Sequence, residues 1–474
     1  MAGPFLLEIR RGTQSALLLV REASLRSLPA DISLAPARLE LRSAGACGAL
    51  ELPPGVSLAP GSCRGLRRLP GEGLHLRLRL RAAPGGAELV YNLRESLKPQ
   101  KNCIFYCQSC GDVIVKERKF LRVLPLPSEN WSALVEEWCC HPNPFAKSTL
   151  HPQRDDCFLG DTFFLLNSGN ESHVPEPPIC FSETGHHASQ NGSTLKSKEN
   201  TRVFCKRCKT MLGETISSDT IKYYVTEVIV QPSEGSFKTI PRSQFVQSMV
   251  AQCLMELSSA KSTFRFTIKG DDGKIYILIW LLNSDTLLVE SLGSSSSHNV
   301  FTLFGDIFMP NSGPVGTWNA VKVLYQPCIK SRNKDDPNRF YGVICTPGDS
   351  STVITGVLLW ILILLVFLGK AKLCSVSLKT ALLGMTLGIY LTWMPLSPML
   401  QLGLLSSYWS VQLIVIEAAV ADLADAWEND FGVHPLKFPS ETCLELLLIL
   451  GLSTTSLPPS LQCMNSFQVA FLKM

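Results

Sequence analysis

The chain has 474 residues, of which 46% are hydrophobic and 18% are charged, and its formal net charge is +4. This composition forms cores and excludes a largely disordered protein, and the length allows two or three domains of about 100–200 residues each. A dedicated nucleic-acid binder usually shows a concentrated basic face, and the small net charge argues against one. We therefore expect no direct nucleic acid partner.

The cysteines and the first residues predict the compartment. There are 17 cysteines, an odd number with irregular spacing, which is a poor framework for disulfides. The opening MAGPFLLEIRRG lacks the basic region and long apolar core of a signal peptide. We expect reduced thiols and a cytoplasmic, in part nuclear, location.

Residues 1–100 are predicted to form an N-terminal β domain. In GLHLRLRLRA the leucines fall on one face of a strand, while His75 and the arginines fall on the other. Shorter strand candidates, split by Pro- and Gly-rich turns, are FLLEIRR, SALLLVREA and ARLELRSA. The basic face could bind an acidic partner, although a solvated sheet face is the simpler interpretation.

Two Cys-x-x-Cys pairs lie in the next predicted region, residues 101–215. FYCQSCGD contains Cys107 and Cys110, and VFCKRCKTMLGE contains Cys205 and Cys208. Two such turns can supply four sulfur ligands to one tetrahedral zinc ion, which would tie distant strands together. Redox chemistry needs only one pair, at the start of a helix, and inert core cysteines do not explain the repeated spacing. The sequence favours a zinc ribbon, with redox pairs and core cysteines as alternatives.

Between the two pairs lie an unusual motif and a long loop. EEWCCHPNPF, near residues 125–155, has prolines on both sides of an asparagine and predicts a stiff, exposed loop. A thiol and an imidazole at its tip could reach a metal held by another protein; the alternative is that Trp138 and one cysteine pack in the core. Residues 166–200 are rich in Ser, Asn, Gly, Pro and His and predict a loop. Gly213 is expected to allow a turn after the second pair.

Residues 216–332 are predicted to form a further β-rich domain. Its strand candidates are KYYVTEVIVQP, TFRFTIKG, KIYILIWLL, DTLLVES and AVKVLYQPC. One amphipathic helix, SQFVQSMVAQCLMELSSA, interrupts them. Its apolar face, spaced by three and four residues, consists of Phe245, Met249, Cys253, Leu254 and Leu257.

The composition changes abruptly in residues 333–425, which we interpret as an apolar insert. Residues 351–369 carry no charge and are long enough to cross a bilayer as a helix. Residues 380–416 are also uncharged, but Pro395 and Pro398 interrupt them. Two interpretations stay open: a membrane anchor through residues 351–369, or a foreign insert from an unusual transcript. A membrane partner is expected only if the insert is expressed.

The C-terminal residues 438–474 contain Thr442–Cys443, a Leu-Pro at 457–458, and Phe471, which stands fourth from the end. These residues resemble the thioester motif, a following Leu-Pro motif and the terminal phenylalanine of a known family, the HECT ubiquitin ligases. Leu444 and Glu445 depart from the usual Phe-Asn, and a full amino-terminal lobe is not recognisable. With RVLPLPSENW, EEWCCHP and PRSQFVQSMVAQC, the chain resembles the small HECT-like family that binds a cyclin-selective ubiquitin-conjugating enzyme.

This resemblance covers roughly residues 1–332 and 425–474 and implies a ubiquitin-protein transferase. It implies that Cys443 accepts ubiquitin as a thioester and passes it to substrate proteins such as cyclins. It also implies that the conjugating enzyme docks near residues 231–253. From the residues alone, Cys443 is equally well explained as one more apolar residue of the helix CLELLLIL.

The resemblance implies an alternative function without catalysis. The chain would then be a zinc-stabilised binding protein that inhibits or escorts the zinc-dependent endonuclease of pre-mRNA 3′-end processing. Cys140 would be the sulfur ligand that displaces the hydrolytic water of that enzyme. The expected fold class is α+β and β-rich, with antiparallel sheets tied by a four-cysteine zinc ribbon, a small C-terminal HECT-like unit and an apolar insert.

Overall fold

The computed structural model describes residues 5–20, 31–43, 46–59, 61, 63–83, 89–126, 151–168, 201–234, 239–291, 316–330, 340–341 and 423–474. Strands dominate and helices are few, as the sequence predicts. Cys140 with its loop, and residues 351–369, lie outside the described residues. Among the residues that are described, no helix is both long enough and apolar enough to cross a membrane.

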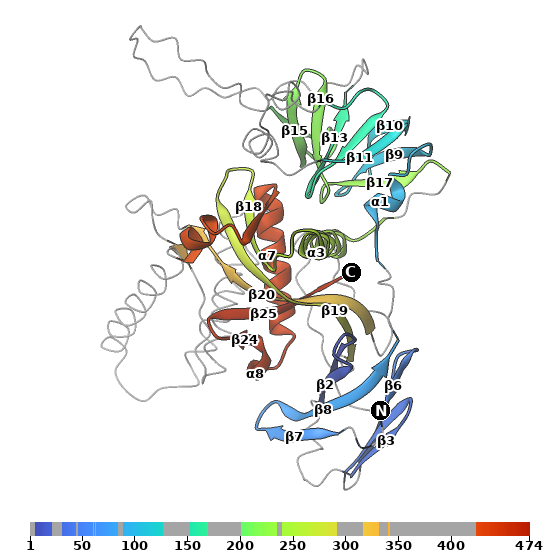
Figure 1. Cartoon of the computed structure of the whole chain (residues 1–474), viewed down its shortest axis with the longest axis vertical. Helices are drawn as coiled ribbons and strands as arrows, with labels where there is room; N and C mark the ends of the chain where they lie inside the picture. Colours follow the sequence, from blue (N-terminus) through green and yellow to red (C-terminus); the bar gives the residue numbers. More distant parts are fainter. Residues whose placement is uncertain are drawn as a thin grey trace, which may run out of the picture.

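One sheet of 11 strands runs through the lower and central parts of the molecule (Figure 1). Its order is β24-β25-β20-β19-β1-β2-β8-β6, with β18 beside β19, β23 beside β18, and β7 beside β8. The N-terminal strands are β1 (Phe5–Arg10), β2 (Ser15–Val20), β6 (Val56–Leu58), β7 (Arg64–Leu69) and β8 (Gly73–Ala82). The others are β18 (Arg265–Gly270), β19 (Ile275–Ser291), β20 (Gly316–Pro327), β23 (Val433–Phe438), β24 (Cys463–Met464) and β25 (Phe467–Lys473).

The long strand β19 joins regions that the sequence analysis separated. KIYILIWLL and DTLLVES were expected as two strands, but they form one strand of 17 residues with register shifts near Asn283. Such irregularities bend a strand and let it serve two cores. The first half of β19 pairs with β18 and the second half with β1. Strands from the predicted N-terminal, third and C-terminal ranges therefore share one sheet.

The strand β8 forms over the predicted residues, and its leucines are buried while Arg77, Arg79 and Arg81 are exposed. His75 differs from the expectation, because its side chain is buried beside Glu72, at 3.3 Å. The leucines pack into a separate N-terminal core with residues of β1 and β2. A small sheet contributes to this core: β3 (Asp31–Ala35), β4 (Arg38–Ser43) and β5 (Ala46–Glu51).

Two further sheets form the upper end of the molecule and together are called the knuckle unit (Figure 1). The first, in the order β10-β9-β17, consists of β9 (Asn102–Cys107), β10 (Val113–Lys119) and β17 (Val228–Pro232). The second, in the order β11-β12-β13-β16-β15-β14, consists of β11 (Arg122–Pro125), β12 (Asp156–Leu159), β13 (Phe163–Asn167), β14 (Arg202–Phe204), β15 (Met211–Ser217) and β16 (Thr220–Tyr224). Outside this unit, β21 (Ile329–Lys330) pairs with β22 (Phe340–Tyr341).

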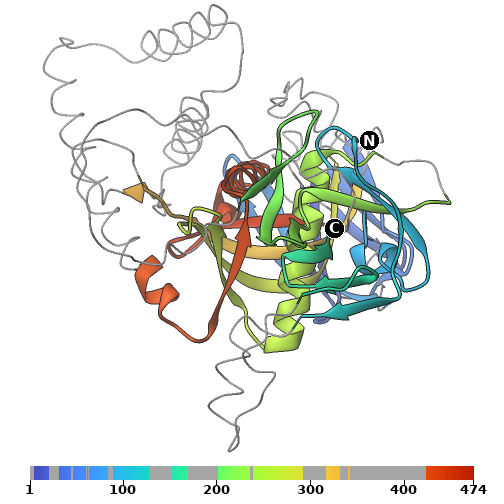
Figure 2. The ribbon, with the colours of Figure 1, turned by 90° about the horizontal axis from the view of Figure 1, so that it is seen from above.

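Helix α3 (Arg242–Lys261) lies between the knuckle unit and the large sheet (Figures 1 and 2). Helix α7 (Ser440–Thr455) packs against β25 and β18, α1 (Leu93–Ser96) lies beside β17, and α8 (Pro459–Gln462) lies beside β24 and β25, away from the knuckle unit. The predicted apolar face of α3 is buried, but so are Val246, Val250 and Ala251 on other sides of the helix. A helix covered nearly all round is a core helix rather than an amphipathic surface helix. The predicted helix around Cys443 forms as α7 and packs beside α3.

Candidate functional site

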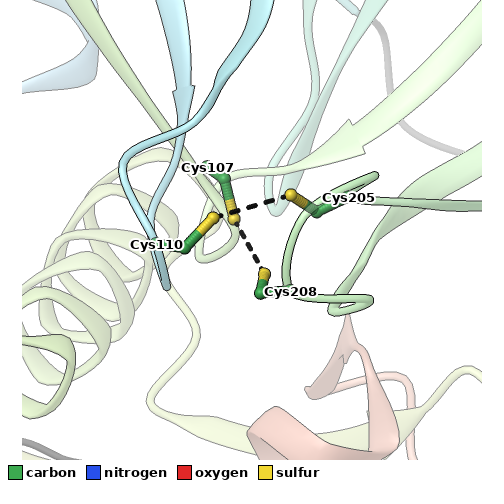
Figure 3. A group of neighbouring side chains, drawn as sticks. All are labelled: Cys107, Cys110, Cys205 and Cys208. Carbon is green, nitrogen blue, oxygen red and sulfur yellow. Dashed lines mark hydrogen bonds between the residues drawn. The ribbon is translucent and has the colours of Figure 1, made fainter.

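The four predicted cysteines of the two pairs meet at one point (Figure 3). Their sulfur atoms all lie within 4.8 Å of one another. The Sγ–Sγ distance is 3.6 Å between Cys107 and Cys208 and 3.7 Å between Cys110 and Cys205, and all four are free thiols. In a tetrahedral site with metal–sulfur bonds of about 2.3 Å, the sulfurs lie about 3.8 Å apart. The cluster therefore has the size and the donor set to hold a metal ion.

Each cysteine pair lies in the turn of a β-hairpin, and the two hairpins belong to different sheets. In the turn between β9 and β10, the N–H of Gly111 donates to the carbonyl of Cys107 at 2.8 Å. The turn between β14 and β15 repeats this bond, from Lys209 to Cys205 at 3.0 Å. Gly111 and Lys209 both have left-handed φ angles, +71° and +62°. Glycine adopts this conformation freely, whereas for lysine it costs about 1–2 kcal/mol.

The surroundings of the sulfurs favour the thiolate form, which binds metals, at Cys208, whereas they favour the thiol at Cys107. Burial raises the pKa of the Cys107 thiol, and a bond from the backbone N–H of Cys110 opposes this effect. At Cys208, burial is outweighed by the hydroxyl and backbone N–H of Thr210, and the pKa is lowered to about 7. A bound cation would favour deprotonation of all four thiols, because metal binding displaces their protons.

Gly213 allows β15 and β16 to approach each other closely, next to the turn that holds Cys205 and Cys208, called the second knuckle. The sequence predicted a turn there, but Gly213 lies within β15, opposite Val203 and Tyr223. A Cβ atom at this position would lie 1.8 Å from the carbonyl oxygen of Lys222. Only glycine therefore allows β15 to approach β16 so closely, and the residue serves strand spacing rather than a turn.

Gln108 follows Cys107 in the first cysteine turn, called the first knuckle, and connects the cysteine cluster to a buried arginine. Its side-chain amide donates to the carbonyl of Ile240 at 3.0 Å and accepts a bond from Arg242 at 3.2 Å. Arg242 also pairs with Glu227 at 3.0 Å and with Glu445 at 2.8 Å. Burial lowers the pKa of Arg242, but the two glutamates outweigh it and keep the guanidinium charged. These residues, the Arg242 hub, join the first knuckle to the starts of α3 and α7.

The sequence analysis missed the Arg242 hub because nothing in the local pattern marks it. Glu227 interrupts the apolar run VTEVIV, and Arg242 follows a proline at the start of a helix. Charged residues at such positions are usually solvated. A single acidic residue inside a predicted strand was the one available signal; in the structure Glu227 lies in the turn between β16 and β17.

Cys443, the predicted acceptor of ubiquitin, lies in the first turn of α7 and has 0% exposure. Its thiol donates to the carbonyl of Lys269 at 3.5 Å. Burial raises its pKa well above the ordinary value, and three carboxylates raise it further, those of Asp271, Asp272 and Glu227. A transfer nucleophile acts as an accessible thiolate. In the described conformation Cys443 is a protonated core thiol, and its catalytic role stays a prediction.

The other residues that carry the HECT resemblance pack as structural elements. Leu457 is buried, and the following proline caps α8. Phe471 lies in β25, is 3% exposed, and has the Lys322 ammonium 5.3 Å from its ring centroid. Thr442 donates to Glu227 at 2.7 Å. The Thr-Cys motif is thus anchored to the Arg242 hub rather than presented at the surface.

Comparison with known proteins identifies the family. Residues 8–350 and 414–469 match the family described as HECT-like ubiquitin-conjugating enzyme (E2)-binding. The chain belongs to this family. The match passes over residues 351–413, which include the predicted membrane span. No solved structure matches the chain.

Three mammalian relatives have similar lengths, and each is named as an E3 ubiquitin-protein ligase. The chain is 47% identical to the bovine protein, over 99% of this chain and 97% of that protein. It is 46% identical to the human and mouse proteins over the same shares. These relatives and the HECT-like family confirm the resemblance and support a ubiquitin ligase function with a conjugating enzyme as partner.

The region predicted to dock the E2 enzyme of this HECT-like family, residues 231–253, has two parts. The helical part, from Arg242 onward, is almost entirely buried. The part before the helix is more accessible, with Pro232, Glu234 and Thr239 exposed. We call its described residues, 231–234 and 239–241, the docking segment. The knuckle unit holds both ends of it, through Ser233 N–H to Asn102 at 3.0 Å and through Gln108.

Proposed function

We propose that this chain is a zinc-stabilised ubiquitin-protein ligase whose knuckle unit presents the docking segment to a ubiquitin-conjugating enzyme. The family and the name of the relatives support the enzyme class and the partner. The position of Gln108 is the observation that supports the docking segment as the binding site of the conjugating enzyme. One side chain inside the metal-binding turn holds the carbonyl of Ile240 and the guanidinium of Arg242, on either side of Pro241.

Zinc is the ion that the four-cysteine cluster fits best. Four thiolates at tetrahedral spacing are typical of structural zinc sites. The chain's own residues then do the work of positioning. The two hairpins fix Gln108, and Gln108 fixes the docking segment relative to α3.

Transfer through Cys443 is the part of the proposal that rests on the family resemblance. The thiolate of Cys443 would attack the ubiquitin thioester on the conjugating enzyme, and the thiol of that enzyme would leave as the new thioester forms. A lysine of the substrate, such as a cyclin, would then displace Cys443. Because the thiol faces Lys269 in the core, the first turn of α7 must separate from β18 before this step.

A second candidate function needs no chemistry at Cys443, and the burial of this thiol favours it. The chain would be a binding protein that holds its partner through the knuckle unit and surrounding loops. The partner implied by the resemblance is the zinc-dependent endonuclease of pre-mRNA 3′-end processing, capped by the loop around Cys140. Residues 127–150 lie outside the described residues, so Cys140 stays a prediction.

One experiment separates the two candidates. A panel of conjugating enzymes charged with fluorescent ubiquitin is mixed with the full-length chain, Cys443→Ala or Cys328→Ala, and run on a non-reducing gel. Cys328 is the control, because it is also a fully buried core thiol. Covalent transfer predicts a reducible ubiquitin adduct with the parent and Cys328→Ala but not with Cys443→Ala. If no conjugating enzyme loses its ubiquitin faster in the presence of the parent chain, the ligase proposal fails.

The docking segment is tested by binding alone. Gln108→Ala removes both bonds that hold Ile240 and Arg242, and it should weaken binding of the conjugating enzyme about tenfold or more while the metal content is unchanged.

For the second candidate, Cys140→Ala should relieve inhibition in an endonuclease cleavage assay. If Cys140→Ala inhibits the endonuclease as strongly as the parent, residues 138–141 have a structural role and Cys140 is not the ligand.

A further inference from the structure

The positive charge of this chain is concentrated in one short stretch. Residues 64–81 contain six arginines and one glutamate, a net charge of +5, whereas the whole chain has a net charge of +4. All other residues together therefore carry a net charge of −1. The small net charge of the whole chain predicted no nucleic acid partner. Nevertheless, the hairpin formed by β7 and β8 is strongly basic.

The register of the hairpin places five of these arginines on one face. Arg64 pairs with Arg77, and Arg67 pairs with His75, with a register shift between the two pairs. Paired residues of antiparallel strands point to the same side of the sheet, so Arg64 and Arg67 share the face of the odd-numbered residues of β8. The arginine face defined in this way consists of Arg64, Arg67, Arg77, Arg79 and Arg81, all of them exposed.

The arginine face is not neutralised by its surroundings. Among the described residues, none of its five arginines has an ion-pair partner. Glu72, the acidic residue of the hairpin, is engaged by His75 at 3.3 Å and by the backbone N–H of Ser460 at 2.8 Å. Arg64 lies directly opposite Arg77, and like charges in this position destabilise a sheet. A bound polyanion would remove this repulsion.

The composition of the face indicates which polyanion fits. All five charges are guanidinium groups, which bind phosphate oxygens in a bidentate manner. The arginines of β8 repeat every second residue, about 6.8 Å apart. This repeat is close to the distance between successive phosphates in an extended nucleotide strand. The face therefore matches a polymer that carries one charge per unit.

A protein partner would find little apolar surface on this part of the molecule. Protein interfaces usually have a buried apolar centre with a few large anchoring side chains. Within the described residues of 5–83, Leu66 is the one large hydrophobic side chain that is exposed, at 42%. We propose that the arginine face binds the phosphate backbone of single-stranded nucleic acid, without reading its base sequence.

The test is the salt dependence of binding, measured on the full chain by the fluorescence anisotropy of a labelled 20-nucleotide oligouridine. Each phosphate contact with a single strand contributes about −0.7 to the slope of log K against log salt concentration, so five contacts predict a slope of roughly −3.5. The triple variant Arg77→Gln, Arg79→Gln and Arg81→Gln removes three contacts. The magnitude of its slope should decrease, to a slope of roughly −1.4. Its affinity at low salt should be at least about tenfold weaker than that of the parent.

The matched control changes the same number of charges elsewhere. The control variant Lys98→Gln, Lys101→Gln and Lys119→Gln changes three exposed lysines, two just before the knuckle unit and one at the end of β10, and should leave affinity and slope as in the parent. Arg64→Gln alone keeps the whole of β8 and should lower the magnitude of the slope by about 0.7. Its melting temperature should be equal to or higher than that of the parent, because the repulsion with Arg77 is removed.

Two results would overturn the proposal. One is a triple variant that binds oligouridine with the affinity and slope of the parent. The other is a polyglutamate peptide of equal charge that binds as tightly as oligouridine, which would make the face a site for an acidic protein.

Discussion

Gln108 and Arg242, which are 134 residues apart in the chain, are joined by a hydrogen bond of 3.2 Å inside the molecule. This bond links a turn of the four-cysteine cluster to the start of the central helix α3. Arg242 also pairs with Glu227 and with Glu445, which lies in α7 close to Cys443. Contacts therefore connect the first cysteine turn to the first turns of α7. The four-cysteine cluster, the docking segment and the predicted acceptor thiol therefore belong to one packed network.

The first prediction concerns metal content. The chain should bind one zinc ion, and Cys107→Ser or Cys205→Ser should lose it, because three thiolates no longer close a tetrahedral site. Elemental analysis of the purified proteins measures this directly. Cys63→Ser, a half-buried thiol outside the cluster, should keep the full amount of zinc. A full complement in both knuckle variants would exclude the assigned ligands.

The second prediction concerns the Arg242 hub. Arg242→Met should lower the free energy of unfolding by about 3–5 kcal/mol, because it leaves two buried glutamates without their cation. Arg94→Met removes an ion pair with Glu256 at the surface, where both side chains are at least half exposed, and should change stability by at most about 1 kcal/mol. Urea unfolding of the zinc-loaded proteins compares the two. Equal stabilities would show that the hub is not a buried charge network.

The third prediction concerns the spacing of strands behind the second knuckle. Gly213→Ala should destabilise the chain by about 3 kcal/mol, because its Cβ would collide with the carbonyl of Lys222 and force β15 away from β16. Gly12→Ala is the control, since no atom lies within 4 Å of the added Cβ. Thermal unfolding followed by circular dichroism should show a lowered midpoint for Gly213→Ala alone.

The fourth prediction concerns pH. Burial raises the pKa of Glu8, but Lys322 and Arg10 outweigh it, and the pKa in the folded protein lies below its ordinary value. The unfolded chain therefore takes up this proton first as the pH falls. The contribution of Glu8 to stability is complete above about pH 4.3 and is lost as the pH drops through the lower, folded pKa.

Glu8→Gln tests this sign. The stability difference between the parent and Glu8→Gln should be largest near pH 6 and should shrink as the pH falls below about 4. Glu51→Gln, at an exposed glutamate of β5, should differ little from the parent at any pH. Urea unfolding at each pH gives the differences. A gap between parent and Glu8→Gln that widens in acid would mean that Glu8 is not held by Lys322 and Arg10.

Much of the local structure could be predicted from spacing alone. The leucines of β8 alternate and are buried, and the predicted face of α3 is buried as well. The prediction for Gly213 was wrong because the residue's role depends on the neighbouring strand β16. The two short strand patterns in β19 did not reveal one strand, because a bend within a strand resembles a break in the pattern.

The sequence by itself determined the β-rich character, the four candidate sulfur ligands and the family, because periodicity and motif spacing are local properties of the chain. Only the tertiary structure decided that the two cysteine pairs meet, that Gln108 reaches Arg242, and that Cys443 faces the core. It also brought Arg64 opposite Arg77. These relationships depend on which distant elements pack together, and packing is determined by the burial of the whole chain rather than by any one segment.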